Sequence, residues 1–199
     1  MASNVLAVGN ADRAYGSHGM KRPSWDEYFL KLAMLASERA TCPRMHCGCV
    51  LVKDRFVLTT GYNGSLPNMP HCDEVGCLIV DDHCVRTNHA EINALCQATR
   101  HGVNLDGAAA YVTNMPCTAC AKALIAAGLR RVVVFSEYHD TLAEHFFQGS
   151  GVELCRLAMP EREIHYDLAS YTSARAGRCQ AEGGCDCGCG NGPASPTSL

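Results

Sequence analysis

Short apolar segments rich in β-branched residues alternate with amphipathic helical segments along most of this 199-residue chain. Helical spacing of apolar residues predicts helices, whereas compact Val-rich runs predict strands. We expect helices over 24–39, 89–101, 118–127 and 141–147, and strands over 47–52, 56–62, 107–114, 131–136 and 152–157. The resulting order, α-β-β-α-β-α-β-α-β, predicts an α/β fold of three layers, α/β/α, with a mixed sheet of about five strands.

The first predicted helix has a recognisable beginning and a stripe of apolar residues. Ser24 followed by Glu27 is a capping box, in which each side chain accepts a hydrogen bond from the other residue's backbone. The apolar residues at helical spacing are expected to face the core: Trp25, Tyr28, Phe29, Leu32 and Leu35.

The charge balance excludes some classes of partner. Charged residues make up 19% of the chain and the net charge is -3. Nucleic acid and acidic membranes attract basic surfaces, so we expect neither as a partner. The sequence has no apolar run long enough to span a membrane and no apparent secretory signal, so we expect a cytoplasmic protein.

Both ends of the chain differ in composition from its middle. Residues 1–22 show little periodicity and are expected to be a flexible segment or the remnant of a tag, and 23–176 to form the folded domain. Residues 177–199 combine closely spaced cysteines with Gly, Asp, Asn and Pro but carry few core-forming residues. Such a composition is typical of a disordered tail.

Fourteen cysteines are a high number for a chain of this length. Without a secretory signal, metal binding explains them better than a disulfide framework. Four of them lie on predicted helices or strands and are expected to be small core residues: Cys47, Cys49, Cys96 and Cys155.

Two short motifs carry the chemistry: His89-Ala90-Glu91 and Pro116-Cys117-Thr118-Ala119-Cys120. Both lie where a helix is expected to begin, and the positive end of a helix lowers the pKa of a nearby thiol. One imidazole and two thiolates supply three ligands to zinc and leave a fourth position open, as in catalytic zinc sites. The sequence therefore predicts a catalytic zinc held by His89, Cys117 and Cys120.

Glu91 lies two residues from a predicted ligand, within reach of a zinc-activated water. A carboxylate there can accept the water's proton and deliver it to a substrate, as hydrolytic deamination of a heteroaromatic amine requires. The pair H-x-E and P-C-x-x-C is the known signature of zinc-dependent deaminases. The alternative is a closed structural zinc with Cys84 or Cys96 as fourth ligand, which would leave Glu91 without a role.

Further segments extend this similarity over residues 24–157. They include Gly61-Tyr62-Asn63-Gly64-Ser65, the stretch from Pro70 to Cys77, the stretch from His83 to Glu91, and Tyr111 to Cys117. In these segments the chain resembles the deoxycytidylate deaminases. The resemblance implies a cytidine-deaminase-like fold and zinc-dependent conversion of dCMP to dUMP with release of ammonia, for thymidylate synthesis. It also implies a homo-oligomer, a hexamer, with dCTP and dTTP as allosteric effectors.

The resemblance also suggests three substrate contacts. Asn63 corresponds to a residue that holds the sugar, and otherwise is a turn asparagine before Gly64. Arg44 matches a family arginine that can pair with the 5′-phosphate, and otherwise is a solvated surface residue. Tyr138 matches a tyrosine that contacts phosphate or base, and otherwise is an ordinary half-buried side chain.

A second, structural zinc would explain how the long connection over 65–88 is ordered. Its predicted ligands are Cys42, His71, Cys77 and Cys84, with Cys72 able to replace any of them. Some members of the family hold a zinc in this region. The alternative is a set of reduced, partly buried thiols.

Three other functions stay open from sequence alone. The first is deamination of a modified cytosine nucleotide, such as 5-substituted dCMP, or of dCTP. The second is a nucleic-acid cytosine or adenine deaminase, which the acidic charge disfavours. The third is a zinc-binding interaction protein without catalysis, which the presence of Glu91 disfavours.

Overall fold

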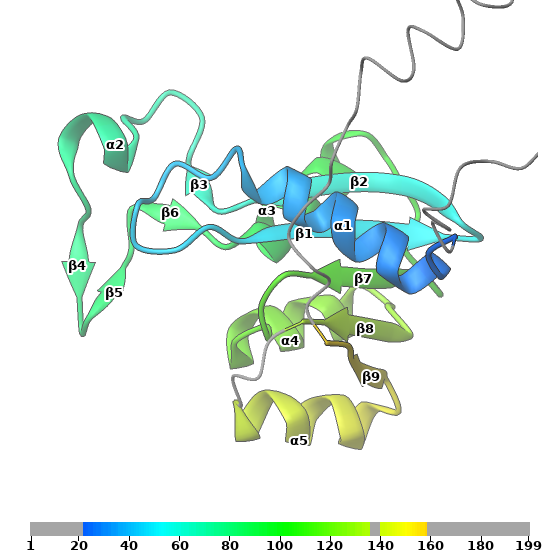
Figure 1. Cartoon of the computed structure of the whole chain (residues 1–199). Helices are drawn as coiled ribbons and strands as arrows, with labels where there is room; N and C mark the ends of the chain where they lie inside the picture. The colour runs from blue at the N-terminus through cyan, green and yellow to red at the C-terminus, as the bar shows by residue number, and fades with distance from the viewer. Residues whose placement is uncertain (1–21, 136–139, 159–199) are drawn as a thin grey trace, which may run out of the picture. The chain divides into compact units, whose positions relative to one another are not determined.

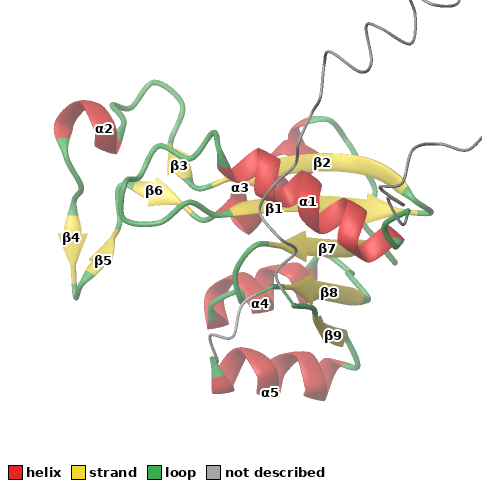
Figure 2. Cartoon of the chain, viewed as in Figure 1, coloured by secondary structure: helices red, strands yellow, loops and turns green. Residues whose placement is uncertain are grey.

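The structure is a computed structural model that describes residues 22–135 and 140–158. These residues belong to one compact unit, Met1–Pro160; the second unit, Glu161–Leu199, lies outside them. Their centre is a five-stranded sheet in the order β2-β1-β7-β8-β9 (Figure 2). The strands are β1 (Gly48–Lys53), β2 (Phe56–Tyr62), β7 (Ala109–Val112), β8 (Arg131–Val134) and β9 (Glu153–Arg156). The pairs β2-β1 and β1-β7 are antiparallel and the other two are parallel, so the predicted mixed sheet is confirmed.

Helices cover both faces of this sheet (Figure 1). One face packs against α1 (Trp25–Ser37). The other packs against α3 (Ala90–Arg100), α4 (Thr118–Ala126) and α5 (Thr141–Ser150). The three-layer α/β/α arrangement is therefore confirmed, with every predicted helix and strand present between residues 24 and 157.

Alternation along β1 explains how a single strand serves both cores. Val50 and Val52 belong to the cluster beneath α1, whereas Cys49 and Leu51 belong to the cluster beneath the other helices. Successive side chains of a strand point to opposite faces, and a strand covered on both faces is apolar throughout.

The buried face of α1 agrees with the prediction only in part, since Phe29 is buried and Leu32 packs against the same cluster. Phe29, Leu30 and Ala33 are buried, whereas Trp25, Tyr28 and Leu35 are 43%, 44% and 50% exposed. The capping box of Ser24 and Glu27 is present as predicted. Ala33 is the closest point of contact, because a Cβ at Gly48 of β1 would collide with the Ala33 carbonyl oxygen. Gly48 thus permits close approach of β1 to α1 at Ala33, while Trp25, Tyr28 and Leu35 remain partly exposed.

Residues 64–88, named the arm here, connect β2 to α3 through very short elements. These are β3 (Gly64–Ser65), α2 (Cys72–Val75), β4 (Ile79–Val80), β5 (His83–Cys84) and β6 (Thr87–Asn88). β3 pairs with β6 and β4 with β5, and α2, β4 and β5 lie to the left of the sheet in Figure 1. The arm exposes several large apolar side chains, among them Met69, Val75 and Val80. Core packing therefore contributes little to its order.

The predicted flexible N-terminal segment and the cysteine-rich tail fall almost entirely outside the described residues. Among residues 22–135 and 140–158, no helix is both long and apolar enough to cross a membrane. No disulfide joins the described cysteines. Of the predicted core cysteines, Cys49 is buried and Cys47 and Cys155 are partly buried; Cys96 is exposed, so the prediction was wrong for it.

Candidate metal centre and active site

His89 and Cys117 occupy equivalent positions at the beginnings of neighbouring helices. His89 is the N-cap of α3 and Cys117 is the N-cap of α4, and both have extended backbone. Neither side chain makes a capping hydrogen bond. The helix geometry therefore directs both side chains away from their own backbones and leaves them available as ligands.

The three predicted zinc ligands converge. Nδ1 of His89 lies 3.5 Å from Sγ of Cys117 and 3.4 Å from Sγ of Cys120. All three donor atoms lie within 4.8 Å of one another. An imidazole nitrogen and two sulfurs at this separation match the donor set and size of a zinc site with three protein ligands.

The protonation of these groups also suits a metal. Hydrogen bonds from Cys120 and His89 lower the pKa of the Cys117 thiol to about 3. The hydrogen bond to Cys117 raises the pKa of Cys120 and likewise that of His89. Without metal, one thiolate is thus stabilised by its two neighbours, and a cation can replace the protons that they share.

Glu91 lies in the first turn of α3 and is 5% exposed. Burial raises the pKa of its carboxyl group above the ordinary value, while the neighbouring His89 acts in the opposite direction. A buried carboxyl group with a raised pKa is a better proton acceptor than a solvated one. Glu91 is therefore placed and tuned to move a proton beside the three ligands.

Close packing of α3 on β2 places His89 and Glu91. Gly61 of β2 faces the first turns of α3, where a Cβ would collide with the Ala90 carbonyl oxygen and lie 2.5 Å from the Ala94 nitrogen. Asn93 of α3 donates from Nδ2 to the carbonyl oxygen of Tyr62, 2.8 Å away. The glycine permits the contact and the amide fixes its register, neither of which the sequence analysis identified.

The predicted substrate contacts have different surroundings. Both ends of the Asn63 amide are bound to backbone: Nδ2 donates to the Met45 carbonyl oxygen at 2.8 Å, and Oδ1 accepts from the Cys47 N–H at 2.7 Å. The exposed Arg44 donates to the carbonyl and carboxylate oxygens of Asp82 at 2.8 and 3.0 Å. Tyr138 lies outside the described residues. Asn63 thus shapes the segment that precedes β1, and Arg44 reaches the β4-β5 turn.

A second group of ligand atoms links the arm to the segment before β1. Sγ of Cys42 lies 3.7 Å from Sγ of Cys77, and Sγ of Cys72 lies 3.6 Å from Sγ of Cys84. The four sulfurs lie within 4.8 Å of one another. Three of the predicted ligands are thus brought together, but His71 is not among them, and Cys72, the substitute left open by the sequence, takes its place.

His71 lies outside this four-cysteine group, at the beginning of α2. It is the N-cap residue, and its backbone N–H donates to Oε2 of Glu74 at 2.9 Å. Cys72 is the first residue inside the helix and is buried. The sulfur of Cys72 therefore joins the group, and the His71 ring does not.

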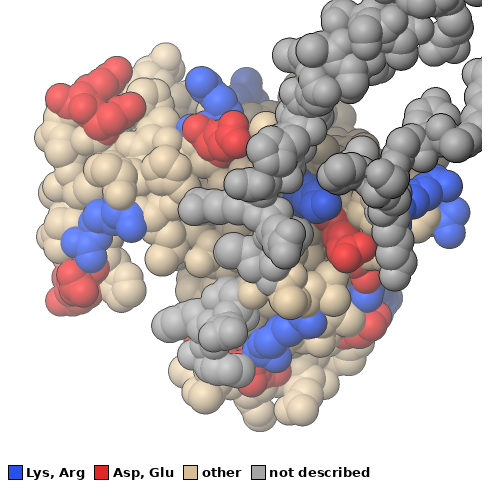
Figure 3. All heavy atoms as spheres, viewed as in Figure 1, with Lys and Arg blue, Asp and Glu red and all other residues tan. Residues whose placement is uncertain are grey.

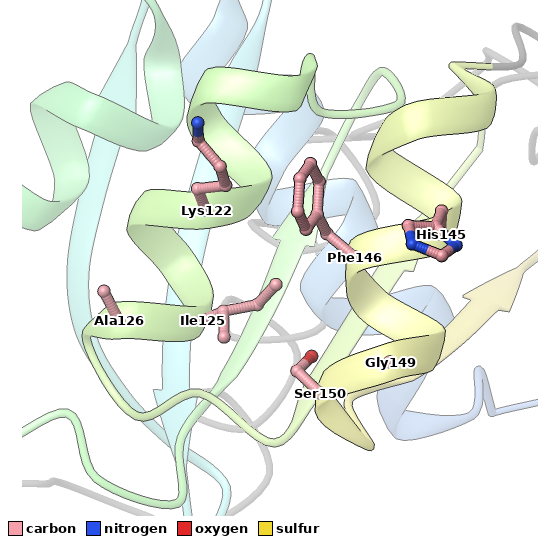
Figure 4. Close-up of a pocket in the computed structure, with 7 residues that line it drawn as sticks. All are labelled: Lys122, Ile125, Ala126, His145, Phe146, Gly149 and Ser150. Atoms are coloured by element: carbon pink, nitrogen blue, oxygen red, sulfur yellow. The ribbon is translucent and has the colours of Figure 1, made fainter.

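An open groove lies between α4 and α5 (Figure 4). Lys122 and Ile125 of α4 and His145 and Phe146 of α5 line it. None of its lining residues is a predicted ligand or substrate contact, so the groove is not part of the candidate site.

Zinc-dependent nucleobase and nucleotide deaminases are the class that this fold and site define, with H-x-E and P-C-x-x-C at converging helix starts. Residues 23–136 match the family described as "Cytidine and deoxycytidylate deaminase zinc-binding region". The chain belongs to this family.

Two of three similar proteins are named deoxycytidylate deaminase. ComE operon protein 2 of Bacillus subtilis is 41% identical over 143 residues, which cover 71% of this chain and 76% of that protein. The deoxycytidylate deaminase of Mycobacterium phage D29 is 42% identical over 126 residues, 57% of this chain and 96% of that protein. The deoxycytidylate deaminase of Schizosaccharomyces pombe is 36% identical over 153 residues, 72% of this chain, but the match spans only 47% of that protein.

A solved structure shares the fold. The dCMP deaminase of cyanophage S-TIM5, in complex with dCMP and dUMP, has a TM-score of 0.61 and 29% sequence identity. The match covers 69% of this chain and 99% of that one. The cytidine-deaminase-like architecture predicted from sequence is confirmed.

Proposed function

We propose that this protein is a zinc-dependent hydrolase that converts dCMP to dUMP and releases ammonia. The observation that carries the proposal is the convergence of His89, Cys117 and Cys120 beside the buried carboxyl group of Glu91. Relatives named deoxycytidylate deaminase, and the related structure with dCMP and dUMP, support the choice of substrate. The dUMP would supply thymidylate synthesis.

His89, Cys117 and Cys120 would hold the catalytic zinc, because their donor atoms fit its preferences in type and number. When bound, zinc supplies a Lewis acid that makes water nucleophilic near neutral pH.

Glu91 moves the protons of the reaction. It accepts one proton from the attacking water and transfers it to the cytosine ring nitrogen next to the amino-bearing carbon. It then carries the second water proton to the departing amino group. A C–O bond forms, the C–N bond breaks and ammonia leaves, so one water molecule accounts for every atom gained.

A substrate panel tests this proposal. Ammonia release is measured with dCMP, 5-methyl-dCMP, dCTP, cytidine and single-stranded DNA, with Glu91→Gln as the control for contaminating activity. The expected result is the highest kcat/KM for dCMP. A preference for 5-methyl-dCMP or dCTP would show that the proposed substrate is wrong but the mechanism is right. A preference for single-stranded DNA would overturn the assignment of a nucleotide substrate.

Charge on the visible surface supports a small substrate over nucleic acid. On the face shown in Figure 3, Lys and Arg side chains lie beside Asp and Glu side chains rather than in a continuous basic stripe. A nucleic-acid track requires clustered positive charge.

We also propose that Cys42, Cys72, Cys77 and Cys84 hold a structural zinc. Four cysteine sulfurs are a common closed zinc set. Burial opposes ionisation of Cys84, but hydrogen bonds from the Arg86 backbone and the Cys72 thiol lower its pKa to about 6, so a thiolate is available. Elemental analysis should find two zinc ions per chain, and one in Cys77→Ser; one in both proteins would overturn this second site.

Arg44 remains our proposed contact to the substrate phosphate, Tyr138 our proposed contact to phosphate or base, and Asn63 our proposed residue on the sugar side. Because Arg44 is exposed and already pairs with Asp82, binding to phosphate requires it to change partner. Arg44→Ala should therefore raise KM for dCMP and leave that for cytidine, which has no phosphate, unchanged.

We further propose a cytoplasmic homo-oligomer, a hexamer, that is activated by dCTP and inhibited by dTTP. Light scattering coupled to gel filtration measures the mass, and the substrate panel repeated with each nucleotide measures the regulation. A monomer, or equal rates with and without both nucleotides, would overturn the corresponding part.

A further inference from the structure

Asp140 receives hydrogen bonds from the beginnings of two helices. Its Oδ1 accepts from the backbone N–H groups of Leu142 and Ala143 at 3.1 and 3.0 Å, and so caps α5. Its Oδ2 accepts from the backbone N–H of Thr118 at 3.0 Å. The Thr118 hydroxyl lies 3.1 and 3.2 Å from the two oxygens. One carboxylate therefore joins α5 to α4.

Thr118 is the first residue of α4 and lies between the two cysteine ligands. Cys117 before it is the N-cap, and Cys120 is two residues further along the chain. A usual N-cap side chain satisfies free N–H groups of its own helix. Cys117 makes no such bond, because its sulfur faces His89 and Cys120. Asp140 supplies an acceptor that the helix's own N-cap does not.

We propose that Asp140 is a positioning residue of the metal site: by binding the N–H and hydroxyl of Thr118, it holds the start of α4 so that Cys117 and Cys120 face His89. The inference rests on the proposed function in taking these three residues as zinc ligands. Residues that orient metal ligands typically change metal affinity or activity by about 10- to 100-fold when they are replaced.

The chain offers a substitution that separates the two contacts of Asp140. In Asp140→Asn the amide oxygen can still accept from Leu142 and Ala143 and cap α5. The NH₂ group then faces the Thr118 N–H, so two donors oppose each other and the backbone contact to α4 is lost, while the Thr118 hydroxyl can still bond to the amide. With two zinc ions per chain, release to a competing chelator should show two kinetic phases, and the phase that is missing in Cys120→Ser reports the catalytic zinc. We expect Asp140→Asn to accelerate this phase by about 10- to 100-fold. We also expect kcat to fall while KM for dCMP changes little.

Repeating the Asp140 substitution in a Thr118→Pro variant distinguishes positioning of the ligands from a loss of helix stability. Proline is favoured at the first position of a helix and has no N–H, so Thr118→Pro removes both Thr118 donors with little harm to α4. Alone it should also accelerate zinc release, and in this background Asp140→Asn should add no further change. Equal acceleration by Asp140→Asn in the wild-type and Thr118→Pro backgrounds would mean that Asp140 does not act through Thr118.

Asp26→Asn is the matched control. Asp26 lies in the first turn of α1, on the opposite face of the sheet, and it binds Arg131 rather than any of the ligands. It should lower the melting temperature and leave zinc release unchanged. Unchanged release in both Asp140→Asn and Thr118→Pro would overturn the inference while leaving the proposed function intact. A wild-type protein without zinc at His89, Cys117 and Cys120 would overturn both.

Discussion

The two cysteine-containing groups of this protein are supported in different ways. His89, Cys117 and Cys120 stand at the starts of helices that are packed on a five-stranded sheet. Three sulfurs of the four-cysteine group belong to the arm, whose strands are two residues long and whose apolar side chains are largely exposed. In the first case the fold positions the ligands, and in the second the ligands, once joined by a metal, would position the chain. Substitutions in the first group should therefore lower catalytic activity, whereas substitutions in the four-cysteine group should disorder the arm.

Glu91→Gln should have the largest effect and should be purely chemical. Glutamine keeps the size of the side chain but cannot accept the water's proton. We expect kcat to fall by about 10²- to 10⁴-fold, with unchanged zinc content and melting temperature. Steady-state kinetics and elemental analysis test this, and a variant with near wild-type kcat would show that another group carries the proton.

Cys77→Ser should disorder the arm without disturbing the sheet. Structural zinc contributes about 10 kcal/mol or more to the folding of small zinc-bound domains. Amide hydrogen exchange should therefore accelerate by on the order of 100-fold or more over residues 64–88. Exchange in β7 and β8 should stay slow. Cys96→Ser is the matched control, because Cys96 is exposed and belongs to neither group; equal protection of the arm in both variants would contradict the supporting role of the metal.

Local sequence signals were sufficient for the first group and insufficient for the second. The helices packed on the sheet are long enough to show apolar periodicity, and the motifs H-x-E and P-C-x-x-C mark the starts of two of them, so His89 and Cys117 could be placed within a residue or two. Two-residue strands have no periodicity, so the sequence showed the arm only as a long connection. The choice between His71 and Cys72 depended on where a four-residue helix begins, which spacing does not reveal.

The face of α1 and the role of Asp140 were missed for another reason. A broad apolar stripe shows that a helix is amphipathic but does not show its centre, which here is set by the contact of Ala33 with Gly48. Asp140 before Thr141 is a recognisable N-cap signal for α5. Its bond to Thr118 joins residues 22 positions apart and depends on how α4 and α5 pack.

Gly61→Ala tests how tightly the sheet domain holds the site. The added methyl group would collide with the first turns of α3, so the helix must shift. We expect the free energy of unfolding to fall by about 1–3 kcal/mol, with a loss of activity because His89 and Glu91 move. Gly149→Ala in α5 is the control, since its Cβ meets no atom within 4 Å. Chemical denaturation of both variants gives the comparison, and equal stability would mean that α3 adapts without cost.

The smallest effects should come from two ion pairs, one in each region. In the sheet domain, Arg131 binds Asp26 through two nitrogens at 2.6 and 3.0 Å, and both side chains are less than a third exposed. Asp82 of the arm pairs with Arg44 of the segment before β1, and the Asp82 side chain is 92% exposed. Ion pairs in open solvent contribute little because water and salt screen them. Asp82→Asn should therefore leave stability unchanged.

Asp26→Asn should lower the free energy of unfolding by about 1–2 kcal/mol at neutral pH, between the values for exposed and fully buried pairs. The hydrogen bond from Arg131, aided by that from Tyr111, lowers the pKa of Asp26 in the folded protein. Its contribution is therefore complete above the unfolded pKa of about 4, and it is lost as the pH falls through the lower folded pKa. Urea denaturation of wild type, Asp26→Asn and Asp82→Asn from pH 7 downward should show the first two converging only at the acid end. A difference between wild type and Asp26→Asn that stays constant through this range would mean that Asp26 acts through packing rather than charge.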